Sequence, residues 1–228
     1  VGHLLLERDQ YFVSVPMSGK VAVINALNGE LQRLIPVGNE PYALAASAGY
    51  IWGFDGRSSN VFAIDRRLKI YRRSSIDALP DYIIAALGVE SVLGDRIAVI
   101  SSLGELLLLN PEAFVSNQPS RAVTHRLDLA TLTNTTVSSP RNLGSVGAGI
   151  FQTSDLLITY TSRGAVAFEL NAINDLPLSP LWVLKSAASI GTLTAHQGYL
   201  WSTSNQGLRR FDWPTSGQGL DVDAPQVE

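Results

Sequence analysis

One pattern recurs five times along the 228-residue chain: a short turn, four or five residues that favour β-strands, and then a carboxylate or amide side chain. The polar endpoints lie 40, 45, 59 and 43 residues apart. Each turn contains Gly, Ser or Asn, which adopt the backbone conformations of tight hairpins at low cost. The five strand segments are Val21–Asn25, Val61–Asp65, Leu106–Asn110, Ala165–Glu169 and Leu208–Asp212.

Each recurring segment has further β-forming runs beside it. One such run precedes the turn, as at Tyr50 to Phe54, and a run of small or apolar residues lies upstream of that run in the same unit, as at Tyr42 to Ala46. A more charged run follows the polar endpoint, as at Leu68 to Arg73. The chain therefore contains units of four strands in about 40 to 45 residues, and such a sheet buries both faces only when neighbouring sheets stack on it.

This period predicts an all-β chain that forms a β-propeller of four-stranded antiparallel blades, as a single domain over residues 1–228. Five units make five blades, and the alternative is part of a six- to eight-bladed ring. A sandwich or irregular barrel is the competing fold, and no twelve-residue window has helical periodicity. Residues 128–146, which are rich in Thr, Ser and Asn, account for the 59-residue spacing and are expected to form an insertion loop.

A Val-Gly-x-x-Pro element stands at residues 37–41, between a charged run and a run of small residues. Together with the strand Tyr11 to Val15 and the segment Val21–Asn25, this element makes residues 11–70 resemble the YVTN family of β-propeller repeats. The resemblance implies that residues 37–41 cross from the outer strand of one blade to the inner strand of the next. The later units lack the element and follow the family in strand pattern alone.

The composition excludes several classes of protein. Seventeen Lys and Arg against twenty Asp and Glu give a net charge of -3, too little positive charge for a nucleic-acid surface. The absence of cysteine excludes disulfides, thiolate metal sites and a cysteine nucleophile. Apolar runs such as Tyr82 to Val89 are far shorter than a membrane-spanning helix. The chain opens at Val1 with no initiator Met and no leader, so we expect a processed end or a cut.

Groups that could carry chemistry are sparse. His196 adjoins the turn Gln197-Gly198 between two inner strands, Asp55 and Arg57 share a loop, and Trp213 precedes Pro214. These four residues are the candidates for a site at the ring mouth, whereas His3 and His125 are expected at the surface. The recurring Asn, Asp and Glu endpoints are expected to cap the turns that follow them. No catalytic residue, metal site or cofactor is predicted.

Only 16% of the residues are charged, against roughly 25% in typical soluble domains. An apolar, uncharged surface tends to be covered by something else. The sequence therefore predicts a non-catalytic interaction module, an extracytoplasmic (periplasmic or secreted) subunit or scaffold that binds other protein subunits. The alternatives are a hydrolase or lactonase that uses His196 and Asp55, and a lectin-like propeller; a small-molecule or glycan ligand fits either.

Overall fold

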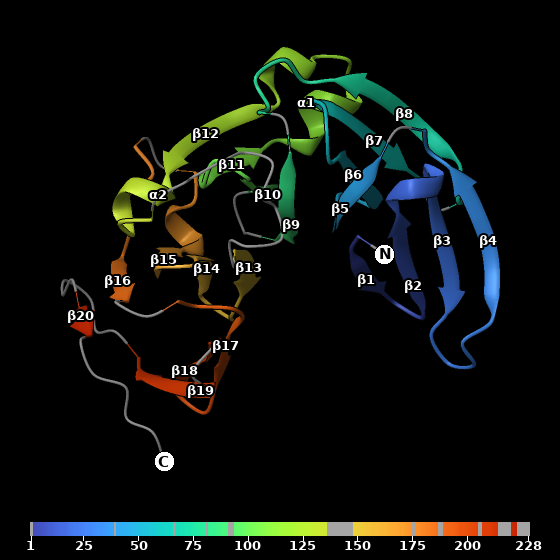
Figure 1. Ribbon diagram of the computed structural model, residues 1–228. Coiled ribbons are helices and arrows are strands. Elements are labelled where there is room, and N and C mark those ends of the chain that lie inside the picture. Colours follow the sequence, from blue (N-terminus) through green and yellow to red (C-terminus); the bar gives the residue numbers. More distant parts are fainter. Residues whose placement is uncertain are drawn as a thin grey trace. The chain divides into compact units, whose positions relative to one another are not determined.

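The computed structural model describes residues 2–38, 40–65, 67–80, 82–90, 94–135, 148–174, 177–186, 189–204, 207–213 and 220–222 (Figure 1). Most of its regular structure is β-strand, and the two α-helices, α1 (Pro111–Val115) and α2 (Leu129–Leu132), are one turn long. The prediction of an all-β chain is confirmed. Within these described ranges, no helix is long and apolar enough to cross a membrane.

The strands form five sheets. The first contains β1 (Leu4–Glu7), β2 (Gln10–Val15), β3 (Lys20–Asn25) and β4 (Leu31–Pro36). The second contains β5 (Pro41–Ser47), β6 (Tyr50–Asp55), β7 (Asn60–Ile64) and β8 (Ile70–Ser75), and the third β9 (Ile83–Val89), β10 (Arg96–Ser101), β11 (Glu105–Leu109) and β12 (Val123–Asp128). The fourth contains β13 (Gly149–Gln152), β14 (Leu156–Thr161), β15 (Gly164–Glu169), β16 (Trp182–Ser186) and β20 (Leu220–Val222), and the fifth β17 (Leu193–His196), β18 (Tyr199–Ser204) and β19 (Gly207–Asp212).

The predicted four-stranded antiparallel unit is present in the first four sheets, and the fifth sheet departs from it. In the described part of the chain the fifth sheet has three strands, and β20 instead pairs in parallel with β16, Leu220 opposite Leu184. The prediction of four strands in every unit is therefore wrong for the described residues of the fifth unit. In the sequence, Pro214 comes soon after β19 and lacks the N–H that a paired strand needs.

The predicted insertion loop contains regular structure at its beginning. Asp128 ends β12, and its Oδ1 accepts a 3.0 Å hydrogen bond from the Thr131 N–H, which caps α2. The hydroxyl of Thr133, just after the helix, bonds to that of Thr161 in β14 at 2.8 Å. Residues 136–146 of the predicted loop lie outside the described residues.

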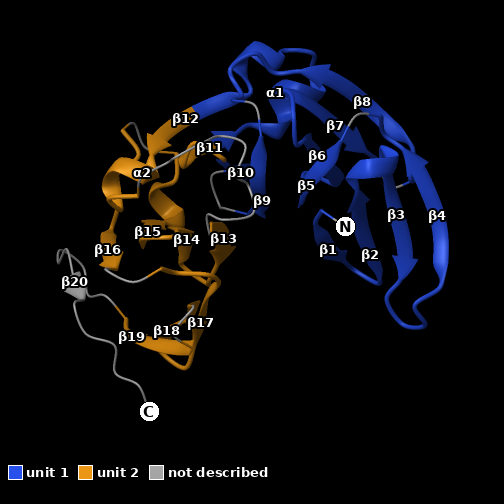
Figure 2. Ribbon diagram, in the orientation of Figure 1, with its two compact units in different colours: residues 1–90, 94–101, 108–124 blue, residues 91–93, 102–107, 125–228 orange. Residues whose placement is uncertain are grey.

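The chain divides into two compact units (Figure 2). Unit 1 contains residues 1–90, 94–101 and 108–124, and unit 2 contains residues 91–93, 102–107 and 125–228. Each unit has its own hydrophobic core, and each is described by itself below. A single domain over residues 1–228, closed as five blades or forming part of a six- to eight-bladed ring, stays a prediction.

In unit 1, the core lies between the first and second sheets. Successive side chains of a strand point to opposite faces, so Phe12 in β2 and Val23 in β3 share a face with Leu5 in β1. That face packs on Leu44 and Phe62 of the second sheet. The second and third sheets then approach closely, because a Cβ at Gly88 in β9 would lie 1.6 Å from the Ala46 carbonyl oxygen in β5.

The predicted turn caps are present at three of the recurring endpoints. The Asn25 Oδ1 accepts the Leu27 N–H at 2.8 Å, the Asp65 Oδ1 accepts the Arg67 N–H at 2.9 Å, and Asn110 caps α1. The predicted crossover is also present, since residues 37–41 connect β4 to β5 and Gly38 has a φ of 72°. These three side chains therefore stabilise the backbone of the turns and of the helix that follow them.

Candidate functional site

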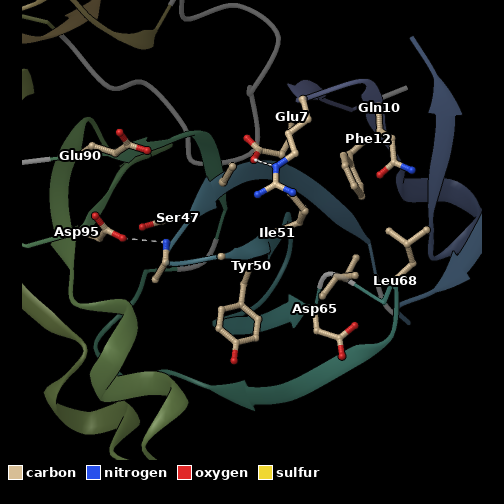
Figure 3. Close-up of a pocket in the computed structure, with 15 residues that line it drawn as sticks. Glu7, Gln10, Phe12, Ser47, Tyr50, Ile51, Asp65, Leu68, Glu90 and Asp95 are labelled. Atoms are coloured by element: carbon tan, nitrogen blue, oxygen red, sulfur yellow. Dashed lines mark hydrogen bonds and ion pairs between the residues drawn. The ribbon is translucent and has the colours of Figure 1, made fainter. Parts of the chain in front are cut away.

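A pocket of about 270 Å³ lies in unit 1, between the β1–β2 and β5–β6 connections and beside Glu90 and Asp95 (Figure 3). Its walls carry the carboxylates of Glu7, Asp65, Glu90 and Asp95, and the guanidinium of Arg8. Four carboxylates against one guanidinium leave the lining with a net charge of -3. The electrostatic field of this lining favours a positively charged group.

Three of these carboxylates already take part in local contacts. The Asp95 Oδ2 accepts the Ala48 N–H at 3.1 Å, and the Asp65 Oδ1 caps its own turn. Glu7 pairs with Arg8 at 3.7 Å, and their side chains are 42% and 67% exposed, so this ion pair contributes little. Among the residues that the structure describes, no group of three His, Cys, Asp or Glu side chains could hold a metal ion.

Tyr50 forms an aromatic wall of the pocket, and its ring lies 5.0 Å from that of Tyr71. Desolvation raises the pKa of the Tyr50 phenol, and the neighbouring Tyr71 and Asp65 raise it further. The phenol therefore stays neutral at physiological pH and can act as a hydrogen-bond donor. The lining thus combines this phenol with four carboxylates and one guanidinium, groups that can form hydrogen bonds with a polar ligand.

The structure brings Asp55 and Arg57 together in the β6–β7 turn of unit 1. Asp55 is buried, and its carboxylate accepts hydrogen bonds of 2.9 Å from the Arg57 N–H and from the Ser58 hydroxyl. The Arg57 side chain is 67% exposed and its Nε lies 2.7 Å from Glu40 Oε2. The hollow beside Asp55 holds about 10 Å³, room for one water at most. Both side chains thus have structural partners.

The structure places His196 and Trp213 in unit 2. His196 ends β17, is exposed, and pairs across the sheet with Tyr199. Trp213 is half-buried against the unit 2 core, with its ring 6.3 Å from that of Trp182 in an edge-to-face arrangement. Packing thus accounts for the Trp213 ring, while His196 keeps a free approach from solvent.

His3, expected at the surface, instead joins two sheets of unit 1. Its Nδ1 accepts the Leu44 N–H of β5 at 2.8 Å, and its backbone N–H donates to the Ser14 hydroxyl of β2 at 2.7 Å. That hydroxyl in turn donates to the Tyr42 carbonyl at 2.7 Å. Burial lowers the pKa of His3, and the bond from Leu44 also requires an unprotonated Nδ1. Sequence patterns give no sign of this partner, because it lies 41 residues away.

The first sheet has a second face, opposite the one that packs on the second sheet. Cross-strand pairing places two rows of side chains on it, one through Leu4 and Leu34 and one through Leu6 and Leu31. These four leucines are 56%, 47%, 55% and 57% exposed. We call this surface the leucine face, and its members are Leu4, Leu6, Tyr11, Val13, Ala22, Ile24, Leu31 and Leu34.

The leucine face could have been noticed in the sequence. The first strand reads Leu-Leu-Leu-Glu, and a strand with one face in water alternates apolar with polar residues. In the second sheet, the positions of β5 that correspond to Leu4 and Leu6, counted from the turn that follows each strand, are Leu44, which is 0% exposed, and Ala46, which is partly buried. The first sheet therefore carries four leucines, each about half-exposed, on a face that is otherwise apolar and partly buried.

The outer face of the fifth sheet differs in chemistry. Cross-strand pairing aligns Thr194 with Trp201 and Arg210, and Tyr199 with Asp212. The Arg210 guanidinium lies 4.6 Å from the centroid of the Tyr199 ring, a cation–π contact. We call this surface the mixed face, and its members are Thr194, His196, Tyr199, Trp201, Thr203, Leu208, Arg210 and Asp212.

Known structures of low sequence identity share this fold. The crystal structure of BamB from Moraxella catarrhalis matches with a TM-score of 0.62 at 18% identity, over 93% of this chain and 57% of BamB. The computationally designed protein Ika8 matches with a TM-score of 0.59 at 13% identity, over 92% of this chain and 59% of Ika8. The chain therefore has a β-propeller fold and spans less than three-fifths of the length of these two proteins.

No protein-family model and no curated protein sequence matches the chain. The likeness to the YVTN family therefore stays a resemblance, while the propeller fold stands on the solved structures. At identities of 18% and 13%, these structures describe the fold alone.

Proposed function

We propose that this chain is a non-catalytic interaction module, a β-propeller subunit or scaffold of a larger protein assembly outside the cytoplasm. The observation that carries the proposal is the leucine face. Four leucines, each about half-exposed, stand in two adjacent rows of one sheet. A contiguous apolar patch of this kind marks an interaction surface, because its exposure to water is unfavourable.

The polar features of the chain support the same proposal. Asp55, named for a hydrolase site together with His196, is buried and accepts two hydrogen bonds from its own turn. The pocket beside Tyr50 has binding chemistry, and its carboxylates Asp65 and Asp95 hold backbone N–H groups. Binding surfaces are therefore better developed in the described residues than a constellation of acid, base and nucleophile.

The test is purification of the tagged chain from its native source, with native mass spectrometry of the complexes. The proposal expects co-purifying protein chains in fixed stoichiometry. It also expects their loss in a Leu6→Glu, Leu34→Glu variant and their retention in a Leu27→Glu control, whose leucine is 88% exposed in the β3–β4 turn. A chain that purifies alone, or partners that bind the double variant as well as the parent, would refute it.

A further inference from the structure

We propose that the leucine face is the docking surface for a second copy of this chain, so that two first sheets pack face to face in a symmetric dimer. The inference rests on the proposed interaction function and names its partner. In a two-fold dimer the same surface meets itself, so the surface must be complementary to its own copy.

The chemistry of the leucine face meets this condition. Each of its eight members is aliphatic or aromatic, and the one polar atom among their side chains is the Tyr11 hydroxyl. Lys20 marks the end of the face, where it pairs with Val15 and Pro36, and its long stem leaves the ammonium free to reach water at a rim. When a copy buries these eight side chains, every charged group beside them therefore keeps its contact with water.

The mixed face is a poorer partner for the leucine face. Packing the two together would bury the Arg210 guanidinium, the Asp212 carboxylate and the His196 imidazole against leucine side chains. Burial of charged groups without new partners costs several kcal/mol. Of these two outer faces, a second leucine face is the one that an aliphatic face accepts at the lower cost.

The geometry of the sheet also suits face-to-face packing. Two twisted sheets stack about 10 Å apart and interdigitate side chains from facing strands, as the first and second sheets do in unit 1. Leu4 and Leu6 occupy one edge strand of the first sheet, and Leu31 and Leu34 occupy the other. The apolar surface thus extends across the full width of the sheet, which gives a copy a broad area of contact.

The experiment is sedimentation velocity of the full chain over about 1 to 200 µM, the range in which a weak dimer dissociates. The inference expects a monomer–dimer equilibrium that added sodium chloride does not weaken, because apolar contacts are not screened. Leu6→Glu should weaken the dimer about a hundredfold, since the symmetry buries two carboxylates. Leu27→Glu and Leu208→Glu are the matched controls, at leucines 88% and 60% exposed and outside the leucine face.

A second readout does not depend on a charged variant. The chain has no cysteine, so Leu34→Cys introduces a unique site for a spin label, with Leu27→Cys as the control. The inference expects dipolar coupling between the labels of two copies for Leu34→Cys at high concentration. A cooperative thermal unfolding transition shows that a variant is folded. If Leu6→Glu is not folded, Leu34→Glu is used in its place.

Two results would overturn the inference. One is a monomer at every concentration; the other is a dimer that Leu6→Glu leaves intact and Leu208→Glu weakens. A monomer that still captures a different protein through the leucine face refutes the self-association and leaves the proposed function in place. A dimer that co-purifies with no chain of another sequence supports the self-association and refutes the wider assembly.

Discussion

The first and fifth sheets each have one face buried on a neighbouring sheet, and they differ in the other face. The buried faces are alike: Phe12 in the first sheet is 3% exposed and Phe211 in the fifth is 5% exposed. The outer faces are not, because one carries leucines and the other carries Thr, His and Arg beside aromatic rings. Burial within the fold thus explains the composition of one face of each sheet, and it does not explain the difference between the two outer faces.

The largest change in the free energy of unfolding should come from substitutions in the buried faces of the first and fifth sheets. Phe12→Ala and Phe211→Ala each remove a buried ring, so each should lower the free energy of unfolding by about 3 to 5 kcal/mol. Leu34→Ala, on the leucine face, should change the monomer by less than about 0.5 kcal/mol. Urea unfolding followed by circular dichroism measures all three. Similar losses for Leu34→Ala and Phe12→Ala would show that the leucine face is covered within the monomer.

A smaller effect separates the two histidines of these sheets. The pKa of His3 lies below its ordinary value of 6.5 because the ring is buried, so the unfolded chain binds the proton more readily than the folded chain. The stability that neutral His3 contributes is therefore present above about pH 6.5 and is lost as the pH falls through the lowered pKa.

The corresponding experiment is unfolding of the chain at a series of pH values between about 7.5 and 5.5. His3→Gln keeps a hydrogen-bond acceptor for Leu44 without a titrating ring, so it should flatten the acid loss of stability over this range. His196→Gln, on the exposed mixed face, is the control and should keep the slope of the parent. An unchanged slope in His3→Gln would argue against the contact between His3 and Leu44.

The smallest effect is expected on the mixed face itself. Arg210→Ala removes the cation–π contact with Tyr199 and should lower the unfolding free energy by about 0.5 to 1 kcal/mol. Arg210→Lys keeps the charge and should recover part of the loss. Thermal melts of the three proteins are sufficient. If Arg210→Ala lowers the unfolding free energy by far more than about 1 kcal/mol, Arg210 makes a further buried contact. The mixed face would then differ less from the leucine face in what covers it.

The repeat of strands and turns was predictable from the sequence because each of its signals is local. Period-two burial, the glycine at position 38 and the capping side chains of Asn25 and Asp65 act within a few residues of their own position. The fifth unit was harder, since its pattern of β-forming residues gave no warning that β20 would pair with β16.

The candidate sites were less predictable because they depend on contacts between distant segments. Arg57, predicted with Asp55 for a ring mouth, pairs with Glu40 on another connection of the chain. The role of His3 depends on Leu44 of another sheet. The leucine face depends on pairing across β1 to β4, which places Leu6 and Leu31 in one row although 25 residues separate them.

The most direct test of this account is hydroxyl-radical footprinting of the chain at low and high concentration, read by mass spectrometry at single residues. The account predicts that Leu4, Leu6 and Leu34 lose reactivity as the concentration rises, whereas Leu27 and Leu208 keep theirs. Equal reactivity of all five leucines at both concentrations, or protection confined to Leu208, would contradict it.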